Sequence, residues 1–184
     1  MNEDYYCLFR RANREELTQL RRSFDKWGIF EFMEAQQLMI KEDRTINKKE
    51  VLITTKTSKD ILNLQIFQPK YAGLAVGELR NKKFLPSLSG AEVIARHSRH
   101  FPYVVVNERA EGLVLYGRDV LGDSVLEVSK KLGQNKIVII LNQNRESIGI
   151  GKTRFSAENI FKKDEVTVYT FFDAGIYLRN QDDR

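Results

Sequence analysis

The apolar residues of this 184-residue chain change their spacing near Pro102, and that change most constrains the fold. Before Pro102, apolar residues recur at intervals of three and four, as in amphipathic helices, or lie in extended runs. After it, six short runs rich in β-branched residues are separated by turn residues at fairly even spacing, which is typical of a small barrel or sandwich. We therefore expect two domains, residues 1–98 and residues 99–184, joined by a helix that ends near His100.

The first domain is expected to begin with an amphipathic helix over residues 13–28. Its apolar stripe consists of Leu17, Leu20, Phe24 and Trp27. Asn13 and Glu16 have the separation of a capping box, and Gly28 is a natural helix end. The basic residues of this segment then project away from the stripe, as on a solvated helix face.

The remainder of the first domain is expected to combine a small, mostly antiparallel sheet with two further helices. The expected elements are extended residues 29–54 with a turn at 41–49, a short helix over 58–67, and a hairpin of 73–79 and 84–88 around the turn 80–83. A helix over residues 30–39 is the alternative at the start, because the alternation breaks at Glu34. Ser89 and Glu92 have capping-box spacing at the start of the joining helix.

Six β-rich runs make up the second domain. They are residues 103–106, 112–116, 124–128, 136–141, 147–151 and 166–171. The segment Gly117–Gly122 is expected to form a single helical turn on the barrel rim, with a plain β-turn as the alternative. Small residues there would let an RNA backbone come close, and Arg118 could contact a phosphate. The fold class is thus α+β, with an N-terminal α/β domain followed by a small barrel.

Composition narrows the class of protein. The 30 Lys and Arg residues exceed the 25 Asp and Glu residues, so the net charge is +5 and suits an anionic partner such as nucleic acid. Cys7 is the only cysteine, which excludes an internal disulfide and a thiolate zinc cage within one chain. The longest purely apolar stretch, residues 137–141, is far too short to span a bilayer. We therefore expect a soluble, intracellular protein with no membrane partner.

The basic residues gather in one window, residues 130–163. Its eight basic residues are Lys130, Lys131, Lys136, Arg145, Lys152, Arg154, Lys162 and Lys163. Only Glu146 and Glu158 oppose them, so the window carries a net charge of +6. A folded domain built this way could have one basic face. The alternative is a solvated surface on which the lysines point in all directions.

Motifs for catalysis or for metal binding are weak. The sequence GIGKT at Gly149–Thr153 ends like a phosphate-binding P-loop, but Glu146 stands where that motif needs its first glycine. His97 and His100 could share one helix face, yet no cysteine is near and a third ligand would have to come from afar. No acidic residue forms an acid–base arrangement with a nucleophile. We expect no enzymatic activity, no catalytic residue, no metal and no cofactor.

Four segments of the second domain resemble PUA domains, which are pseudobarrels that bind structured RNA. They are YGRDVL at 116–121, the strand with Gly149-Ile-Gly151, FSAENI at 155–160 and DAGIYLR at 173–179. In the last segment Ile176 stands where PUA domains commonly have an acidic residue. An α/β domain before a C-terminal PUA domain is similar to the Nip-seven family, ribosome biogenesis factors of eukaryotes and archaea, and this chain looks like an archaeal-type homologue.

The resemblance implies an RNA-binding protein that acts in large-ribosomal-subunit assembly and rRNA processing. Its expected RNA-binding residues are Lys152 and Arg154, with Arg118, Gly117, Lys162, Lys163 and Arg179. The implied partners are ribosomal precursor RNA and ribosome assembly proteins, which would dock on the N-terminal domain. The protein would act as a monomer in the cytoplasm, or in the nucleolus of a eukaryote. Phosphate contacts and shape, rather than base stacking, are expected to carry binding, because few exposed aromatic residues are identifiable.

Two other functions stay open at this point. PUA domains often accompany catalytic domains, so an RNA-modifying enzyme or its accessory subunit is one alternative. A protein-interaction adaptor without direct RNA binding, whose basic face is incidental, is the other.

Overall fold

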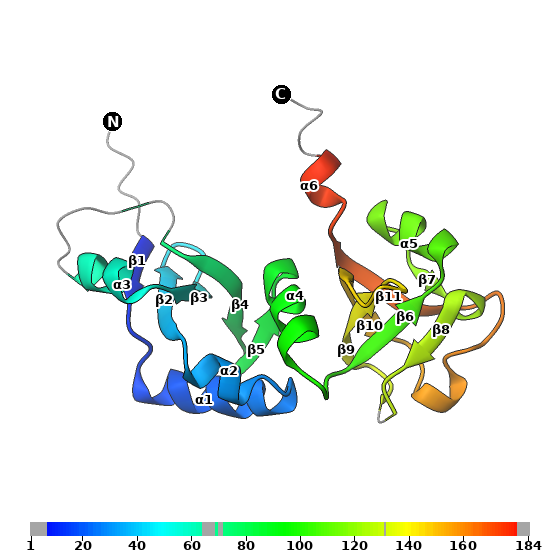
Figure 1. The fold of residues 1–184 in the computed structure, drawn as a ribbon, viewed down its shortest axis with the longest axis horizontal. Helices are drawn as coiled ribbons and strands as arrows, with labels where there is room; N and C mark the ends of the chain where they lie inside the picture. Colours follow the sequence, from blue (N-terminus) through cyan, green and yellow to red (C-terminus); the bar gives the residue numbers. More distant parts are fainter. Residues whose placement is uncertain (1–6, 64–68, 70–71, 131, 180–184) are drawn as a thin grey trace. The chain divides into compact units, whose positions relative to one another are not determined.

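A five-stranded antiparallel sheet forms the framework of the N-terminal unit, residues 1–90, in this computed structural model (Figure 1). The structure describes residues 7–63, 69, 72–130 and 132–179. The strands follow one another in space as in sequence: β1 (Cys7–Arg10), β2 (Gln37–Asp43), β3 (Lys48–Thr54), β4 (Leu74–Arg80) and β5 (Lys83–Pro86). The predicted hairpin around residues 80–83 is confirmed, with Arg80 opposite Lys83.

Three helices accompany this sheet: α1 (Arg14–Lys26), α2 (Phe30–Glu34) and α3 (Lys56–Asn63). The predicted capping box of α1 is present, because Asn13 and Glu16 each accept a hydrogen bond from the other's backbone N–H. Helix α1 packs on β5 through Phe24 and Phe84, whose ring centroids lie 5.1 Å apart in an edge-on arrangement. Leu20, Phe24 and Trp27 of the predicted apolar stripe are thus buried, whereas Leu17 is exposed.

Three expectations for residues 29–90 need correction. The segment after Gly28 is helical over α2 rather than extended, because a helical turn lets Ile29 and Met33 both be buried. The alternative helix over residues 30–39 is thus confirmed for residues 30–34, and β2 begins at Gln37. Helix α3 begins at Lys56, and the rest of the helix predicted over 58–67 lies partly outside the described residues. The joining helix, α4 (Leu88–His97), is capped by Ser87 rather than Ser89, since the Ser87 hydroxyl accepts from the Gly90 N–H at 3.1 Å.

A buried carboxylate ties α1 to three strands of the N-terminal unit. Glu16 is only 3 % exposed, and its two oxygens lie 2.7 Å from Arg10 Nη1 and 2.9 Å from Lys49 Nζ. The same Arg10 guanidinium donates from Nε to Glu42 at 2.8 Å. Because β1, β2 and β3 each supply one partner, this network holds the sheet and the helix in register.

A six-stranded mixed sheet forms the framework of the second unit, residues 91–184. Its order is β7-β11-β10-β9-β6-β8, and it curls into a nearly closed barrel (Figure 1). The strands are β6 (Tyr103–Val106), β7 (Val120–Leu121), β8 (Val125–Val128), β9 (Ile137–Leu141), β10 (Ser147–Thr153) and β11 (Val166–Asp173). Only the pair β6–β9 is parallel among the described strands. The chain is therefore an α+β protein, as the sequence predicts.

Three short helices connect the barrel strands: α5 (Glu108–Leu115), η1 (Gly122–Ser124) and η2 (Ala157–Asn159). A fourth, α6 (Ile176–Arg179), follows β11. The strand predicted over residues 112–116 is wrong, because that segment belongs to α5. Asn107 caps this helix by accepting from the Ala110 N–H at 2.9 Å, and Ala110 and Val114, four residues apart, join the barrel core. The helical turn predicted inside Gly117–Gly122 is also wrong, because the chain turns at Gly117 and enters β7.

Helix α4 is where the two units divide, between Gly90 and Ala91. The boundary predicted between residues 98 and 99 stays a prediction. Ala91 and Ile94 are fully buried, and Glu92 accepts a hydrogen bond from the Ser147 N–H of β10 at 3.3 Å. None of the helices within the described ranges is both long and apolar enough to cross a bilayer.

The Glu16 network makes the stability of the N-terminal unit depend on pH. The hydrogen bond from Arg10, with those from Asn13 and Lys49, lowers the pKa of Glu16 to about 2. Because this pKa is below the value of about 4.3 in an unfolded chain, the stabilisation is complete above that value and is lost as the pH falls towards 2. We expect Glu16→Gln to cost about 2–3 kcal/mol at pH 7 and progressively less at pH 4 and pH 3.

Urea denaturation followed by the fluorescence of Trp27, the chain's single tryptophan, measures this difference in the unit concerned. Glu31→Gln, an exposed carboxylate on α2, is the matched control and should change little at any pH. A loss of unfolding free energy in Glu16→Gln that stays constant down to pH 3 would contradict the lowered pKa of Glu16.

The burial of Ala91 and Ile94 predicts how fragments of the second unit behave. A fragment of residues 91–184 should unfold cooperatively, and so should the shorter fragment 99–184. The longer fragment should be more stable by about 2–3 kcal/mol, because it keeps the buried Ile94 side chain. Far-UV circular dichroism during urea denaturation gives both midpoints. Equal stability of the two fragments would assign α4 to the N-terminal unit. A 99–184 fragment that unfolds without cooperativity would show that the predicted boundary is misplaced.

Candidate nucleic-acid interface

Strand β10 presents two of the predicted RNA-binding residues on one face. Gly151 and Thr153 are buried, whereas Lys152 between them is half-buried and Arg154, directly after the strand, is exposed. Since side chains alternate along a strand, Lys152 and Arg154 share the outer face of the barrel. Within the described residues, the Lys152 ammonium has no ion-pair or hydrogen-bond partner, so it is available to an external anion.

Arg154 and Lys162 meet at one aromatic ring. The Arg154 guanidinium lies 5.1 Å from the centroid of the Phe155 ring, and Lys162 Nζ lies 4.3 Å from it. Both cations also face Glu165, at 3.6 Å and 3.9 Å respectively. The ring and the carboxylate hold the two cations side by side, but the carboxylate offsets part of their charge.

The remaining candidates lie at different places on the barrel. Lys163 is exposed in the turn before β11. Arg118 is exposed in the turn before β7, and its carbonyl accepts from the Thr170 hydroxyl of β11 at 3.0 Å. Gly117 has a φ of 75°, in the left-handed region that glycine adopts at low cost, so its role in the turn is conformational.

Arg179 is engaged within the protein. Its guanidinium lies 3.0 Å from a carboxylate oxygen of Asp173, at the end of β11, and also donates to the Leu115 carbonyl of α5. These contacts fasten α6 to the barrel. Along β11, Asp173 and Glu165 are about 25 Å apart, so the structure separates Arg179 from the pair formed by Arg154 and Lys162.

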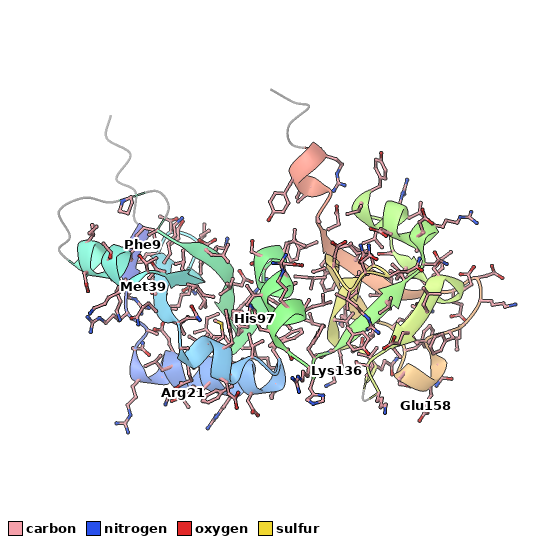
Figure 2. All side chains as sticks on the ribbon, in the orientation of Figure 1. Phe9, Arg21, Met39, His97, Lys136 and Glu158 are labelled. Atoms are coloured by element: carbon pink, nitrogen blue, oxygen red, sulfur yellow. The ribbon has the colours of Figure 1, made fainter. Side chains whose placement is uncertain are left out.

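The net charge of +6 read for residues 130–163 overstates the local positive charge. The fold brings Glu165 to Arg154, and it brings Glu127 to Arg145 at 2.5 Å. Tyr103 also donates to Glu127, and this hydrogen bond together with the Arg145 guanidinium holds the pKa of that carboxyl below its usual range. Lys136, labelled in Figure 2, is exposed just before β9. Part of the positive charge of this window is therefore compensated within the fold.

The two motifs set aside in the sequence occupy ordinary structural positions. Residues 149–153 form strand rather than a phosphate-wrapping loop, and the buried Thr153 hydroxyl donates to the Gly133 carbonyl at 2.8 Å. Helix α4 ends at His97, so His100 is not on the helix. Among the described residues, no three His, Cys, Asp or Glu side chains gather as metal ligands would.

Three exposed aromatic rings on β11 were missed by sequence reasoning. Tyr169 is 43 % exposed, Phe171 52 % and Phe172 56 %. Tyr169 lies directly opposite Lys152 in the ladder. The expectation that few aromatic residues would be exposed is therefore wrong. The doublet Phe171–Phe172 breaks the alternation expected of a strand, and that break was the signal available in the sequence.

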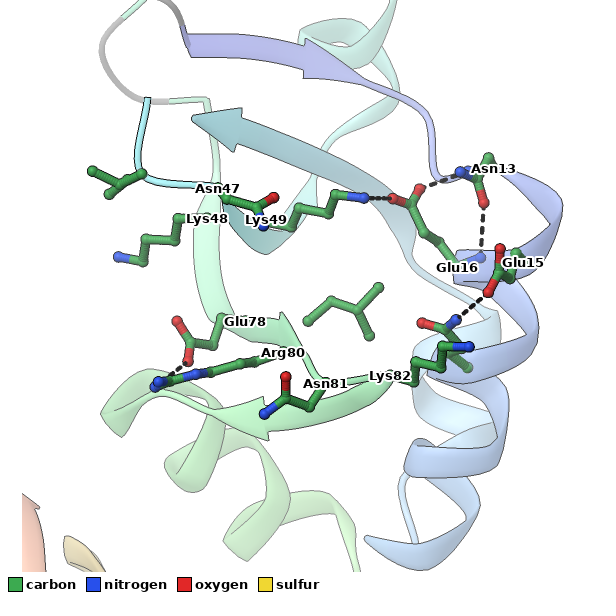
Figure 3. Close-up of a pocket in the computed structure, with 13 residues that line it drawn as sticks. Asn13, Glu15, Glu16, Asn47, Lys48, Lys49, Glu78, Arg80, Asn81 and Lys82 are labelled. Atoms are coloured by element: carbon green, nitrogen blue, oxygen red, sulfur yellow. Dashed lines mark hydrogen bonds and ion pairs between the residues drawn. The ribbon is translucent and has the colours of Figure 1, made fainter. Parts of the chain in front are cut away.

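A polar surface pocket of about 620 Å³ lies in the N-terminal unit (Figure 3). It is lined by the start of α1 and by the tips of the β2–β3 and β4–β5 hairpins. Several of its charged groups are paired with one another, as Lys49 is with Glu16 and Arg80 with Glu78. The pocket contains none of the predicted RNA-binding residues.

Two family models match this chain, one in each of its two units. Residues 9–88 match the family model described as the NIP7/UPF0113 pre-PUA domain, and residues 102–182 match the UPF0113 PUA domain. A UPF0113 protein of Archaeoglobus fulgidus is 36 % identical over 175 residues, covering 94 % of this chain and 95 % of its own.

Solved structures share the fold at low sequence identity. A hypothetical protein of Pyrococcus horikoshii has a TM-score of 0.65 at 13 % identity, covering 91 % of this chain and 95 % of its own. A conserved PUA domain protein of Thermoplasma acidophilum has a TM-score of 0.62 at 12 % identity, covering 94 % and 98 %. With its pre-PUA unit and its PUA barrel, the chain belongs to the NIP7/UPF0113 family.

Proposed function

We propose that this protein binds RNA through the outer face of β10 in its PUA barrel, without catalysing a reaction on it. The observation that carries the proposal is the placement of Lys152 and Arg154 on one face of that strand, with the Lys152 ammonium unpaired within the described residues. Lysine and arginine side chains held on a rigid strand are suited to phosphate contacts, which supply most of the affinity in sequence-independent binding.

The neighbouring cations extend this surface. Lys162 and Arg154 both lie over the Phe155 ring. Lys163 is exposed next to Lys162 in the chain, and Arg118 is exposed beside β11. Arg179 is the weakest member of the predicted set, because its guanidinium already bonds Asp173 and the Leu115 carbonyl. Membership of a family that carries a PUA domain supports an RNA partner.

The cellular role is proposed from the family resemblance alone. In this proposal the bound RNA is a ribosomal precursor and the process is assembly of the large ribosomal subunit. Assembly proteins dock on the N-terminal unit, and the protein acts as a monomer. Crosslinking the protein to cellular RNA and sequencing the fragments tests this role, since reads concentrated in ribosomal precursors support it and reads spread over unrelated RNA do not.

Phosphate contacts by Lys152 and Arg154 predict a measurable salt effect. Each phosphate contact contributes about 0.7 to 0.9 to the slope of log K against log salt concentration, because it releases condensed counterion. The double change Lys152→Ala with Arg154→Ala should therefore flatten that slope by roughly 1.5 and weaken the binding of different RNAs to a similar degree. Fluorescence anisotropy titrations at several salt concentrations measure both quantities.

The exposed turn of the β4–β5 hairpin provides a control of comparable charge. Changing Arg80, Lys82 and Lys83 together to alanine should leave most of the slope intact. A larger loss from this triple variant would move the RNA-binding face to the N-terminal unit. An absence of salt-dependent binding by the unmodified protein would instead favour the adaptor alternative.

A further inference from the structure

We propose that Tyr169, Phe171 and Phe172 of β11 form a stacking platform for unpaired RNA bases, beside the phosphate contacts of Lys152 and Arg154. The inference rests on the proposed function and narrows its ligand to RNA with at least one unpaired segment. Three rings within four consecutive positions are each more than two-fifths exposed. Large aromatic side chains gathered at one exposed place mark an interaction surface, because their burial against a partner is favourable.

The strand register explains why the rings share a face. Tyr169 lies opposite Lys152, and Phe172 lies opposite Ile150, two residues earlier on β10. Lys152 and Ile150 point to the same side of their strand, so Tyr169 and Phe172 do as well. Phe171 is the extra residue of a bulge between these pairs, and it is exposed with them. The bulge therefore places three rings where a regular strand would place two.

The backbone beneath the rings is held firmly. The Thr170 N–H donates to the Asp119 carboxylate at 2.8 Å, and the Thr170 hydroxyl donates to the Arg118 carbonyl. Strand β11 pairs with β10 along the ring-bearing segment, and β7 pairs with it at Val166 and Val168, just before the rings. A platform held by β10 on one side and by the Thr170 hydrogen bonds on the other is ordered before binding, so little conformational entropy is lost when a base stacks on it.

The charges around the rings favour RNA over an apolar protein surface. Lys152 lies across the ladder from Tyr169, at the Cα separation of about 5 Å that opposed residues have. Arg154 is on the same side of β10, and Arg118 is exposed on the opposite flank of β11. Asp119 is also exposed there, but its carboxylate accepts the Thr170 hydrogen bond. Rings flanked by cations match the alternation of base and phosphate along a single strand.

The test compares two ligands of equal charge on the full-length protein. One is an unstructured ten-nucleotide RNA of mixed sequence, and the other is an abasic ribose-phosphate oligomer of the same length. Tyr169→Ala, Phe171→Ala and Phe172→Ala should each weaken binding of the RNA by about 5- to 150-fold, the loss expected for one stacked base. Affinity for the abasic oligomer and the salt slope should not change. Tyr169→Phe, which keeps the ring, should bind RNA as the unmodified protein does.

Two controls separate stacking from folding and from charge. Phe30→Ala removes a ring that is 37 % exposed on α2 and should leave both affinities unchanged. Lys152→Ala should weaken binding of both ligands, because both carry phosphates. Thermal unfolding of each variant shows whether the barrel is intact.

The remaining outcomes overturn the inference in distinguishable ways. Equal affinity of the unmodified protein for the two ligands would exclude base stacking and leave the proposed RNA binding in place. Ring variants that weaken both ligands equally would show that the rings support the barrel. Ring variants without effect on either would assign the rings to another partner, such as a protein. If the unmodified protein bound neither ligand, RNA containing stable helices would decide the proposed function, while the inference about unpaired RNA would already have failed.

Discussion

The close approach of β10 and β11 at Gly149 and Gly151 is the constraint on which the barrel surface depends. A Cβ atom on Gly151 would lie 2.6 Å from the Tyr169 carbonyl oxygen and 2.6 Å from Val168 Cγ1, closer than such atoms can pack. On Gly149 it would lie 2.8 Å from the Phe172 carbonyl oxygen. Positions 149 and 151 of β10, which point toward the barrel core, therefore need glycine if β10 and β11 are to stay this close. The outward-pointing side chains of both strands then stand on two closely packed backbones.

The same constraint explains the similarity of this segment to a phosphate-binding loop. Glycines in such a loop expose backbone N–H groups to phosphate, whereas here they let a strand lie against the barrel core. The lysine after them is then presented on the outside of a sheet rather than at the end of a loop. Similar residue types thus occur in two unrelated structures, which Glu146 distinguishes in the sequence and the strand pairing distinguishes in the fold.

Much of the fold could be predicted because local signals agreed with the tertiary structure. The capping box of Asn13 and Glu16 and the runs around β6, β9 and β10 are examples of such agreement. Helix α5 was not predicted, because the run 112–116 resembles a strand, whereas Asn107 caps the helix and Val114 packs into the barrel core. The site was predicted in part for a similar reason. Lys152 and Arg154 became candidates through the family resemblance, and alternation along β10 places them on one face. The approach of Glu165 and the exposure of Phe172 depend on strand pairing that one sequence does not reveal.

The bulge at Phe171 adds an exposed side chain to β11 without changing which residues of β11 pair with β10 on either side of it. On either side of it the ladder is in regular register, with Thr170 opposite Gly151 and Phe172 opposite Ile150. A chain lacking Phe171 could therefore pair without a bulge, still directing Asp173 inward to Arg179 and Tyr169 outward. Phe171 is thus an addition to the ladder rather than part of its pairing. Removing one residue at this place would change which rings the strand displays and leave the pairs on either side in register.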